Sequence, residues 1–167
     1  HRLNRRQRQM CIRDRLVAGF HSLVGLAAVF VAISAFISPE VFNLGTSGNI
    51  KLASLIEMSI GAAVGAITFS GSIIAFLKLR GLMSGSPITF PGQHVLNLLI
   101  LITIIILTYF LCLNQSPNFF WSLIAISFLV GFLLIIPIGG ADMPVVISML
   151  NSYSGWAAAG IGFTLEN

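Results

Sequence analysis

Five long stretches of this sequence carry almost no charge, and they constrain the fold more than any other feature. They cover roughly residues 16–37, 52–77, 95–113, 119–138 and 145–165. At about 1.5 Å of helical rise per residue, each is long enough to cross a hydrocarbon layer of about 30 Å. Charged residues make up 8% of the chain, against roughly 25% in soluble domains. We therefore expect the chain to be embedded in a lipid bilayer.

The same stretches predict helices. Inside a bilayer every backbone N–H and C=O must be paired within the protein, so a single span is helical unless it belongs to a closed barrel. The stretches lack the alternating pattern of barrel strands. Turn-forming residues separate them, including Pro39, Pro87, Pro117 and the Gly139–Pro144 segment. The sequence predicts an all-α, polytopic transmembrane helix bundle of about five spans.

The basic residues are concentrated at one end of the chain. Six of the nine Lys and Arg lie within residues 1–15, so the net charge of +4 belongs to this tail and does not indicate a nucleic-acid partner. The tail lacks apolar periodicity and a cleavage site, and we interpret it as non-native or disordered. A basic segment on anionic lipid is the alternative. Residues 16–167 form the expected transmembrane domain, which we interpret as truncated at both ends.

Charge also orients the spans. The connection between the second and third spans holds Lys78, Arg80 and His94, whereas the neighbouring connections carry little or no positive charge. The positive-inside rule therefore places residues 78–94 on the cytoplasmic side. The Gly139–Pro144 turn and the start of the first span then face the same side.

The residue types of the spans differ. The third and fourth are rich in Ile, Leu and Phe, which is typical of a lipid-facing shell. The second contains Gly61-x-x-x-Gly65, and the fifth contains a run of Gly and Ala between residues 155 and 162. Small residues let helix backbones approach closely in a membrane. We expect the first, second and fifth spans to form the packed interior.

Polar side chains inside the spans are the candidate functional groups. They are His21, Glu57, Asn151 and the hydroxyls Ser70, Ser72, Ser148, Ser152 and Ser154. An ionisable group in a bilayer costs about 2.5–3.5 kcal/mol on insertion scales and often marks a proton or ion path. Histidine exchanges a proton near neutral pH, and an amide can orient an imidazole or hold a water.

Depth along the helices groups these residues. His21 and Asn151 lie about equally far from the predicted inside surface, so they can share one layer, whereas Glu57 lies nearer the outside. Structural alternatives exist for each: a histidine satisfied by hydrogen bonds, a glutamate that reaches interfacial water, and interhelical bonds for Asn151 and the serines. Asp142 in the inside turn could cap the next helix.

Enzyme motifs for soluble chemistry are absent from the sequence. There is no Gly-rich nucleotide loop after a strand, no zinc spacing and no supported Ser/His/Asp set, so we expect no metal site and no redox cofactor site within these residues. Cys112 lies inside an apolar span, where a thiol is usually a small buried hydrophobe.

A longer motif begins at Gly139. Residues 139–163 read GGADMPVVISMLNSYSGWAAAGIGF. Together with HSLVGLAAVFVA from His21, GAITFSGSIIAF, and the Pro-Gly-Gln-His turn ending at His94, this sequence resembles the membrane domain of the beta subunit of proton-translocating NAD(P) transhydrogenases. The resemblance covers about residues 16–167. Where the family often has threonine before Gly71, this chain has Ser70.

The resemblance implies a function and roles for several residues. The family couples hydride transfer between NAD(H) and NADP(H) to proton movement across a bacterial inner membrane or the mitochondrial inner membrane, and we expect the bacterial one. It implies a proton pathway of His21, Asn151, Glu57, Ser70 and Ser72. It places Asp142 at the surface that couples to the NADP(H)-binding domain.

The resemblance also implies partners. An NAD-binding alpha subunit and an NADP-binding domain would bind both nucleotides outside this fragment, which contains no residue for hydride transfer itself. A dimer of protomers is expected. Two other classes of function remain open from the residues: an ion-coupled secondary transporter, in which Glu57 and His21 line a cavity, and a structural membrane subunit whose polar groups only join helices.

Overall fold

The computed structural model describes the backbone of residues 2–89 and 91–166, and the side chains of residues 12–89, 91–140 and 142–165. Five long helices make up most of it: α1 (Arg2–Ile37), α2 (Leu52–Leu79), α3 (Gln93–Asn114), α4 (Pro117–Ile135) and α5 (Met143–Glu166). A short 3-10 helix, η1 (Gly140–Asp142), precedes α5. The prediction of an all-α helix bundle is confirmed.

Four of the helices have the length and apolar composition of membrane spans: α2, α3, α4 and the Ile12–Ile37 part of α1. Helix α5 has 24 residues, which is sufficient length, but it is not among these four because polar residues such as Asn151 and Ser152 interrupt its apolar sequence. Its role as a fifth span stays a prediction. The backbone of α1 is helical from Arg2 onward, which includes the tail that we set aside.

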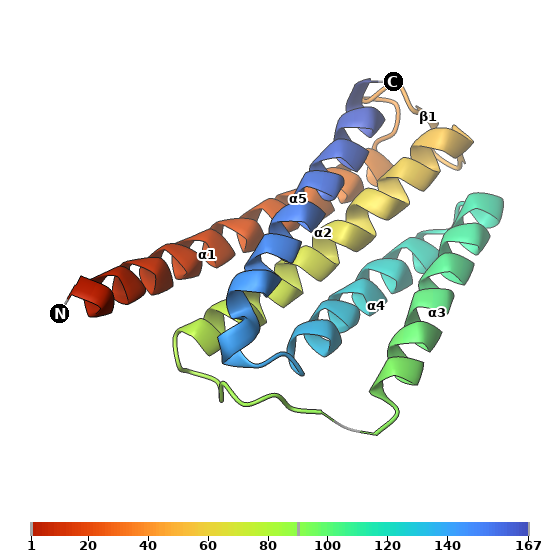
Figure 1. The fold of residues 1–167 in the computed structure, drawn as a ribbon. Helices are drawn as coiled ribbons and strands as arrows, with labels where there is room; N and C mark the ends of the chain where they lie inside the picture. Colours follow the sequence, from red (N-terminus) through yellow and green to blue (C-terminus); the bar gives the residue numbers. More distant parts are fainter. Residues whose placement is uncertain (1, 90, 167) are drawn as a thin grey trace.

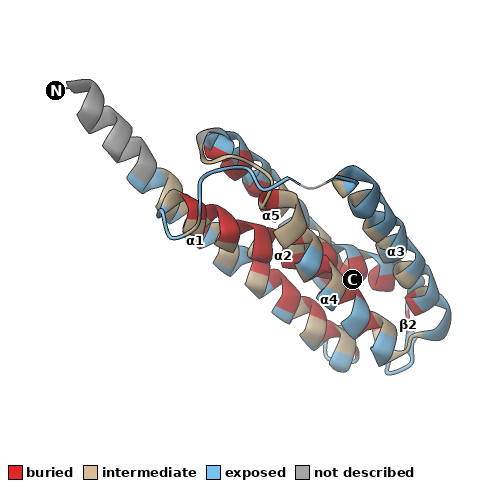
Figure 2. Ribbon diagram, turned by 90° about the horizontal axis from the view of Figure 1, so that it is seen from below, coloured by how far each residue is buried: buried red, intermediate tan, exposed pale blue. Residues whose placement is uncertain are grey.

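Helix α2 lies at the centre of the bundle. It packs against α1, α5 and α4, while α3 packs mainly on α4. Figure 1 shows α1 and α5 on one side of α2 and α4 followed by α3 on the other. In Figure 2, buried residues are concentrated along α2, whereas α3 is almost entirely exposed. Of the three helices expected in the interior, α2 is the central one, with α1 and α5 packed on it, and α3 is the outer helix that its Ile and Leu content predicted.

Helix α4 differs from the expected lipid-facing shell, because one of its faces packs against α2. Gly131 allows this approach: a Cβ atom added there would collide with the Ser70 hydroxyl and lie 2.5 Å from the Ile67 carbonyl oxygen. The ring of Phe69 also meets the ring of Phe128 edge to face, with centroids 5.6 Å apart. The helix ends at Ile135, three residues earlier than expected, because Pro137 has no backbone N–H with which to continue the helical hydrogen bonds.

A small hairpin closes the end of the bundle where α1 meets α2. Strands β1 (Gly45–Thr46) and β2 (Asn49–Ile50) pair antiparallel. The side-chain amide of Gln115, between α3 and α4, forms both backbone hydrogen bonds with Ile50, accepting from its N–H at 2.8 Å and donating to its carbonyl at 3.1 Å. This paired contact joins the α3–α4 turn to the start of α2.

Candidate functional site

Glycines bring α1, α2 and α5 close together. A Cβ atom at Gly25 of α1 would lie 2.7 Å from both the Gly65 carbonyl oxygen and the Phe69 nitrogen of α2. On the other side of α2, a Cβ atom at Gly61 would lie 3.0 Å from the side chain of Ile161 in α5. The Gly61-x-x-x-Gly65 motif therefore joins α2 to both neighbours, as small residues do in membrane helix pairs.

His21 lies in the contact between α1 and α5. Its Nδ1 atom is 3.4 Å from the Oγ atom of Ser154. The Ser154 side chain is buried, and its hydroxyl donates to the backbone carbonyl of Asn151 at 2.8 Å. The imidazole is half-buried, and its Nε2 atom is buried with no hydrogen-bond partner in the part of the chain that the structure describes.

This geometry assigns the proton on each side of the imidazole. A serine hydroxyl has one hydrogen, and the hydrogen of Ser154 is used by the Asn151 carbonyl. While the Ser154 hydrogen points to that carbonyl, the Ser154 oxygen accepts from His21, and the neutral ring then carries its N–H on Nδ1. The lone pair is then on Nε2, the atom that has no partner. Nε2 is the position where this histidine can take up a further proton.

Ser72 of α2 lies at about the same level as His21. Gly25 of α1 faces Phe69 of α2, and the two helices run in opposite directions. His21 lies one turn before Gly25 and Ser72 about one turn after Phe69, so the two residues lie at a similar level. The Ser72 oxygen is fully buried and has no partner among the described residues. A second unpaired polar atom therefore lies at the depth of the imidazole.

Asn151 joins the site through its backbone. Its carbonyl orients Ser154, but its side chain is exposed on the surface of α5. We expected the Asn151 amide beside the His21 ring. Ser154 occupies that position instead, and Asn151 is linked to the ring only through its backbone carbonyl and the Ser154 hydroxyl. Ser154 follows Asn151 by three residues, which places both on one face of the helix. That spacing is the signal that could have identified it.

The structure places Glu57 and Ser70 apart from His21. Ser70 hydrogen-bonds the Ala66 carbonyl of its own helix at 2.9 Å and faces α4 rather than α1. Glu57 precedes Ser72 by 15 residues on α2, which is more than about 20 Å along the axis. Its Oε2 atom is buried without a partner among the described residues. It lies near the start of α2, at the hairpin end of the bundle, and its closeness to the outside surface stays a prediction.

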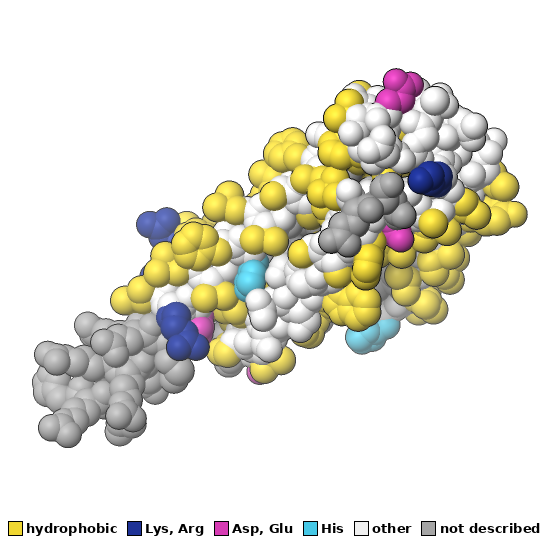
Figure 3. All heavy atoms as spheres, turned by 90° about the horizontal axis from the view of Figure 1, so that it is seen from above, with side chains coloured by type: hydrophobic (Ala, Val, Ile, Leu, Met, Phe, Trp, Pro, Cys, Tyr) yellow, Lys and Arg dark blue, Asp and Glu magenta, His cyan; other side chains and the backbone are white. Residues whose placement is uncertain are grey.

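Asp142 lies at the opposite end from the hairpin, in η1, and its side chain is exposed. The backbone N–H of Gly140, the first residue of η1, donates to the Gly85 carbonyl at 2.8 Å, which ties η1 to the connection between α2 and α3. In Figure 3, hydrophobic side chains extend along the bundle, while most of the charged groups in view lie toward its two ends. Asp142 is thus available for contact at the predicted inside surface.

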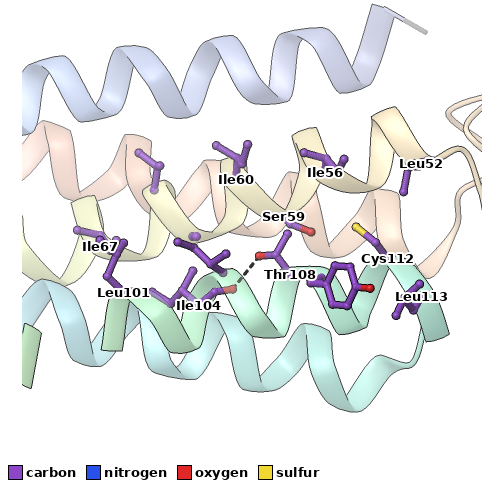
Figure 4. A pocket seen from close by; sticks show the side chains of 14 residues that line it. Leu52, Ile56, Ser59, Ile60, Ile67, Leu101, Ile104, Thr108, Cys112 and Leu113 are labelled. Carbon is purple, nitrogen blue, oxygen red and sulfur yellow. Dashed lines mark hydrogen bonds between the residues drawn. The ribbon is translucent and has the colours of Figure 1, made fainter. Parts of the chain in front are cut away.

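A second space lies between α2 and α3, remote from His21. It is a groove of about 670 Å³ lined almost entirely by apolar side chains, among them Ile56, Ile60 and Ile104. Figure 4 shows the lining side chains that the two helices contribute. Its hydroxyls from Ser59 and Thr108 bond carbonyls of their own helices at 2.6 and 2.9 Å. The groove does not fit a nucleotide, whose phosphates need donors.

Comparison with known proteins agrees with the resemblance seen in the sequence. The family model of the NAD(P) transhydrogenase beta subunit matches residues 4–167. Two curated relatives from Rhodospirillum rubrum, both named NAD(P) transhydrogenase subunit beta, are 61% identical over 158 residues. The match covers 95% of this chain and 34% of each relative, so the chain spans about a third of their length. The chain belongs to the NAD(P) transhydrogenase beta subunit family.

Proposed function

We propose that this chain is the proton-conducting part of a proton-translocating NAD(P) transhydrogenase, and that His21 carries the proton. The observation that carries this proposal is the imidazole held between α1 and α5, with Nδ1 at Ser154 and Nε2 buried and unpaired. A purely structural histidine would have both ring nitrogens satisfied, because an unpaired buried polar atom costs about 1–3 kcal/mol. An unpaired lone pair is what a proton carrier requires.

The proposed path runs through atoms at one depth. Neutral His21 accepts a proton at Nε2, and the resulting imidazolium donates from both nitrogens. Ser154 accepts from Nδ1 in both states, so the ring keeps its orientation as its charge changes. The unpaired Ser72 oxygen lies at the same level and can accept from a water or from the charged ring. The exposed amide of Asn151 holds water one turn away on α5.

Glu57 extends the path toward the outside. It lies too far from His21 for direct transfer, so water must connect them. Ser70 packs beside Gly131 of α4, and its hydroxyl is already bonded within α2, so we give it a packing role rather than a step in the path. These assignments give Glu57 an entry or exit role and leave the exchange step to His21.

Coupling to the redox reaction would use the inside surface. The exposed Asp142 lies nine residues before Asn151 and twelve residues before Ser154, whose hydroxyl contacts His21. A NADP(H)-binding domain that contacts Asp142 can shift α5, and a shift of α5 moves Ser154 relative to the imidazole. NAD(H) would bind to the alpha subunit of the same enzyme. We place the assembly, a dimer of protomers, in a bacterial inner membrane.

The test uses the complete enzyme in vesicles, with proton uptake followed after addition of NADH and NADP⁺. His21→Ala is expected to lower the proton flux about a hundredfold, which is the usual size of a positioned acid–base group. Asn151→Ala is expected to lower it strongly too. His94→Ala is the matched control, because His94 is exposed at the start of α3. Wild-type flux in both His21→Ala and Asn151→Ala would overturn the proposal.

A further inference from the structure

Lys78 occupies an unusual position for a lysine. It lies in the last turn of α2, its side chain is 5% exposed, and it is the only charged residue among the buried residues that the structure describes. A buried ammonium is costly unless its hydrogens are paired. The structure therefore requires an explanation for this charge, and the proton path does not supply one.

Its partners are the carbonyls that end α4. The Lys78 Nζ atom donates to the carbonyl oxygens of Ile138 at 2.8 Å and Ile135 at 3.4 Å, and also to that of Ile136. The last carbonyls of a helix lack partners within the helix and carry its negative partial charge. An ammonium has three hydrogens, which matches these three acceptors. Lys78 thus caps α4 from a different helix.

The capped segment leads directly to the functional residues. Residues 136–142 connect α4 to α5. Among the bonds that the structure describes, one backbone hydrogen bond joins this connection to the α2–α3 loop, from the Gly140 N–H to the Gly85 carbonyl. Ile74 and Ala75, one turn before Lys78, pack in a buried cluster with Ile135, Met143 and Leu150. The end of α2, the end of α4 and the start of α5 therefore form one packed unit.

We propose that Lys78 is a positioning residue that fixes the α4–α5 connection against α2, so that displacement of the Asp142 turn reaches the Ser154–His21 contact. Without the ammonium, the connection can move while α2 stays in place. The coupling part of this inference rests on the function proposed above. The fixing of the connection is a separate structural claim that can be measured by itself.

The first test measures the connection. In the complete enzyme, with Cys11, Cys112 and its other cysteines replaced, Gly85→Cys and Gly140→Cys are introduced together. A Cβ atom at Gly140 would lie 3.4 Å from the Gly85 Cα, and one at Gly85 would lie 4.0 Å from the Gly140 Cα, so cysteines at these positions are direct neighbours. Adding Lys78→Met is expected to slow disulfide formation roughly tenfold, the size expected for losing charged hydrogen bonds. Unchanged cross-linking in Lys78→Met would overturn the proposal.

Two further variants separate position from charge. Lys78→Arg keeps a buried donor cation and is expected to restore most of the cross-linking rate. Lys51→Met makes the same substitution at the exposed opposite end of α2 and is expected to have no effect. A rate in Lys78→Arg as low as in Lys78→Met would contradict the assigned role.

The second test measures coupling as the number of protons translocated per hydride transferred. Lys78→Met is expected to lower this ratio severalfold, and Lys78→Arg to recover it, because only the positioned cation links the two events. A wild-type ratio in Lys78→Met would overturn the coupling role. Failure of the proposed function would instead appear as wild-type flux in His21→Ala, which leaves the cross-linking result unaffected.

Discussion

Helices α2 and α3 are both candidate membrane spans, and α3 is the more apolar of the two, yet α2 is the buried one. Within its most apolar window 61% of α2 is buried, against 11% of α3. In water the more apolar helix would be expected inside. In a bilayer the lipid is as apolar as leucine, so apolar residues gain little from being buried and small residues select the interior.

Polar groups show the same contrast. Thr103 and Thr108 of α3 donate to carbonyls four residues earlier, at 2.8 and 2.9 Å, and so need no other partner. On the α1–α2 side, His21, Glu57 and Ser72 each have a buried atom without a partner among the described residues. The inner helices thus contain buried polar atoms that can exchange protons or bind water, whereas no such unpaired buried atom is found on the described residues of α3.

The glycines test the close packing of the inner helices. Gly25→Ala places a Cβ atom 2.7 Å from α2 backbone atoms, which cannot rotate away. We expect a loss of about 1–3 kcal/mol of stability, the usual cost of overpacking. Thermal unfolding of the complete enzyme in detergent measures it. Gly19→Ala on the same helix is the control, because nothing lies within 4 Å of the added carbon. Equal effects of the two substitutions would refute the close packing of α1 on α2.

A smaller effect is expected at the hydroxyl beside the imidazole. Ser154→Ala removes the acceptor of His21 Nδ1, so the ring can turn and the flux should fall about fivefold, the factor for about 1 kcal/mol of one hydrogen bond. Ser127→Ala removes a hydroxyl that is equally buried but bonded only within α4, and it should leave the flux unchanged. The vesicle assay compares them. Matching losses would show that Ser154 has no special link to His21.

The smallest effect is expected on α3. Leu99 is 56% exposed, so Leu99→Ala should change stability by less than about 0.5 kcal/mol, as for ordinary surface substitutions. Leu55→Ala on α2, where the side chain is fully buried, should cost about 2–5 kcal/mol. Thermal unfolding measures both. A large loss from Leu99→Ala would show that another part of the enzyme covers α3.

Much of the fold could be predicted from the sequence, because the bilayer limits the possible structures. The length of the charge-poor stretches predicted the helices, and the Gly61-x-x-x-Gly65 spacing predicted that α2 lies inside the bundle. The contact of α4 with α2 was missed, because a single Gly131 does not form a repeated small-residue pattern. Likewise, the early end of α4 depends on Pro137, which was not used to set the limit of that span.

For the candidate site, the sequence suggested members but could not give their contacts. His21 and Asn151 could be placed at one depth from helical rise alone. The rotation of α5 about its axis decides that Ser154 lies beside the ring and that the Asn151 amide is exposed. Sequence spacing does not determine that rotation. Lys78 was used only to orient the spans, because its partners are backbone carbonyls of residues 135–138, which leave no mark in the sequence.

The most direct test of the central claim is the protonation of the two nitrogens of His21. Solid-state NMR of the complete enzyme, with ¹⁵N-labelled histidine in lipid, can resolve them after subtraction of the spectrum of His21→Asn. The account predicts a neutral ring with hydrogen on Nδ1 and a bare Nε2, because the hydrogen of Ser154 is used by the Asn151 carbonyl. A neutral ring that carries its hydrogen on Nε2 would contradict it.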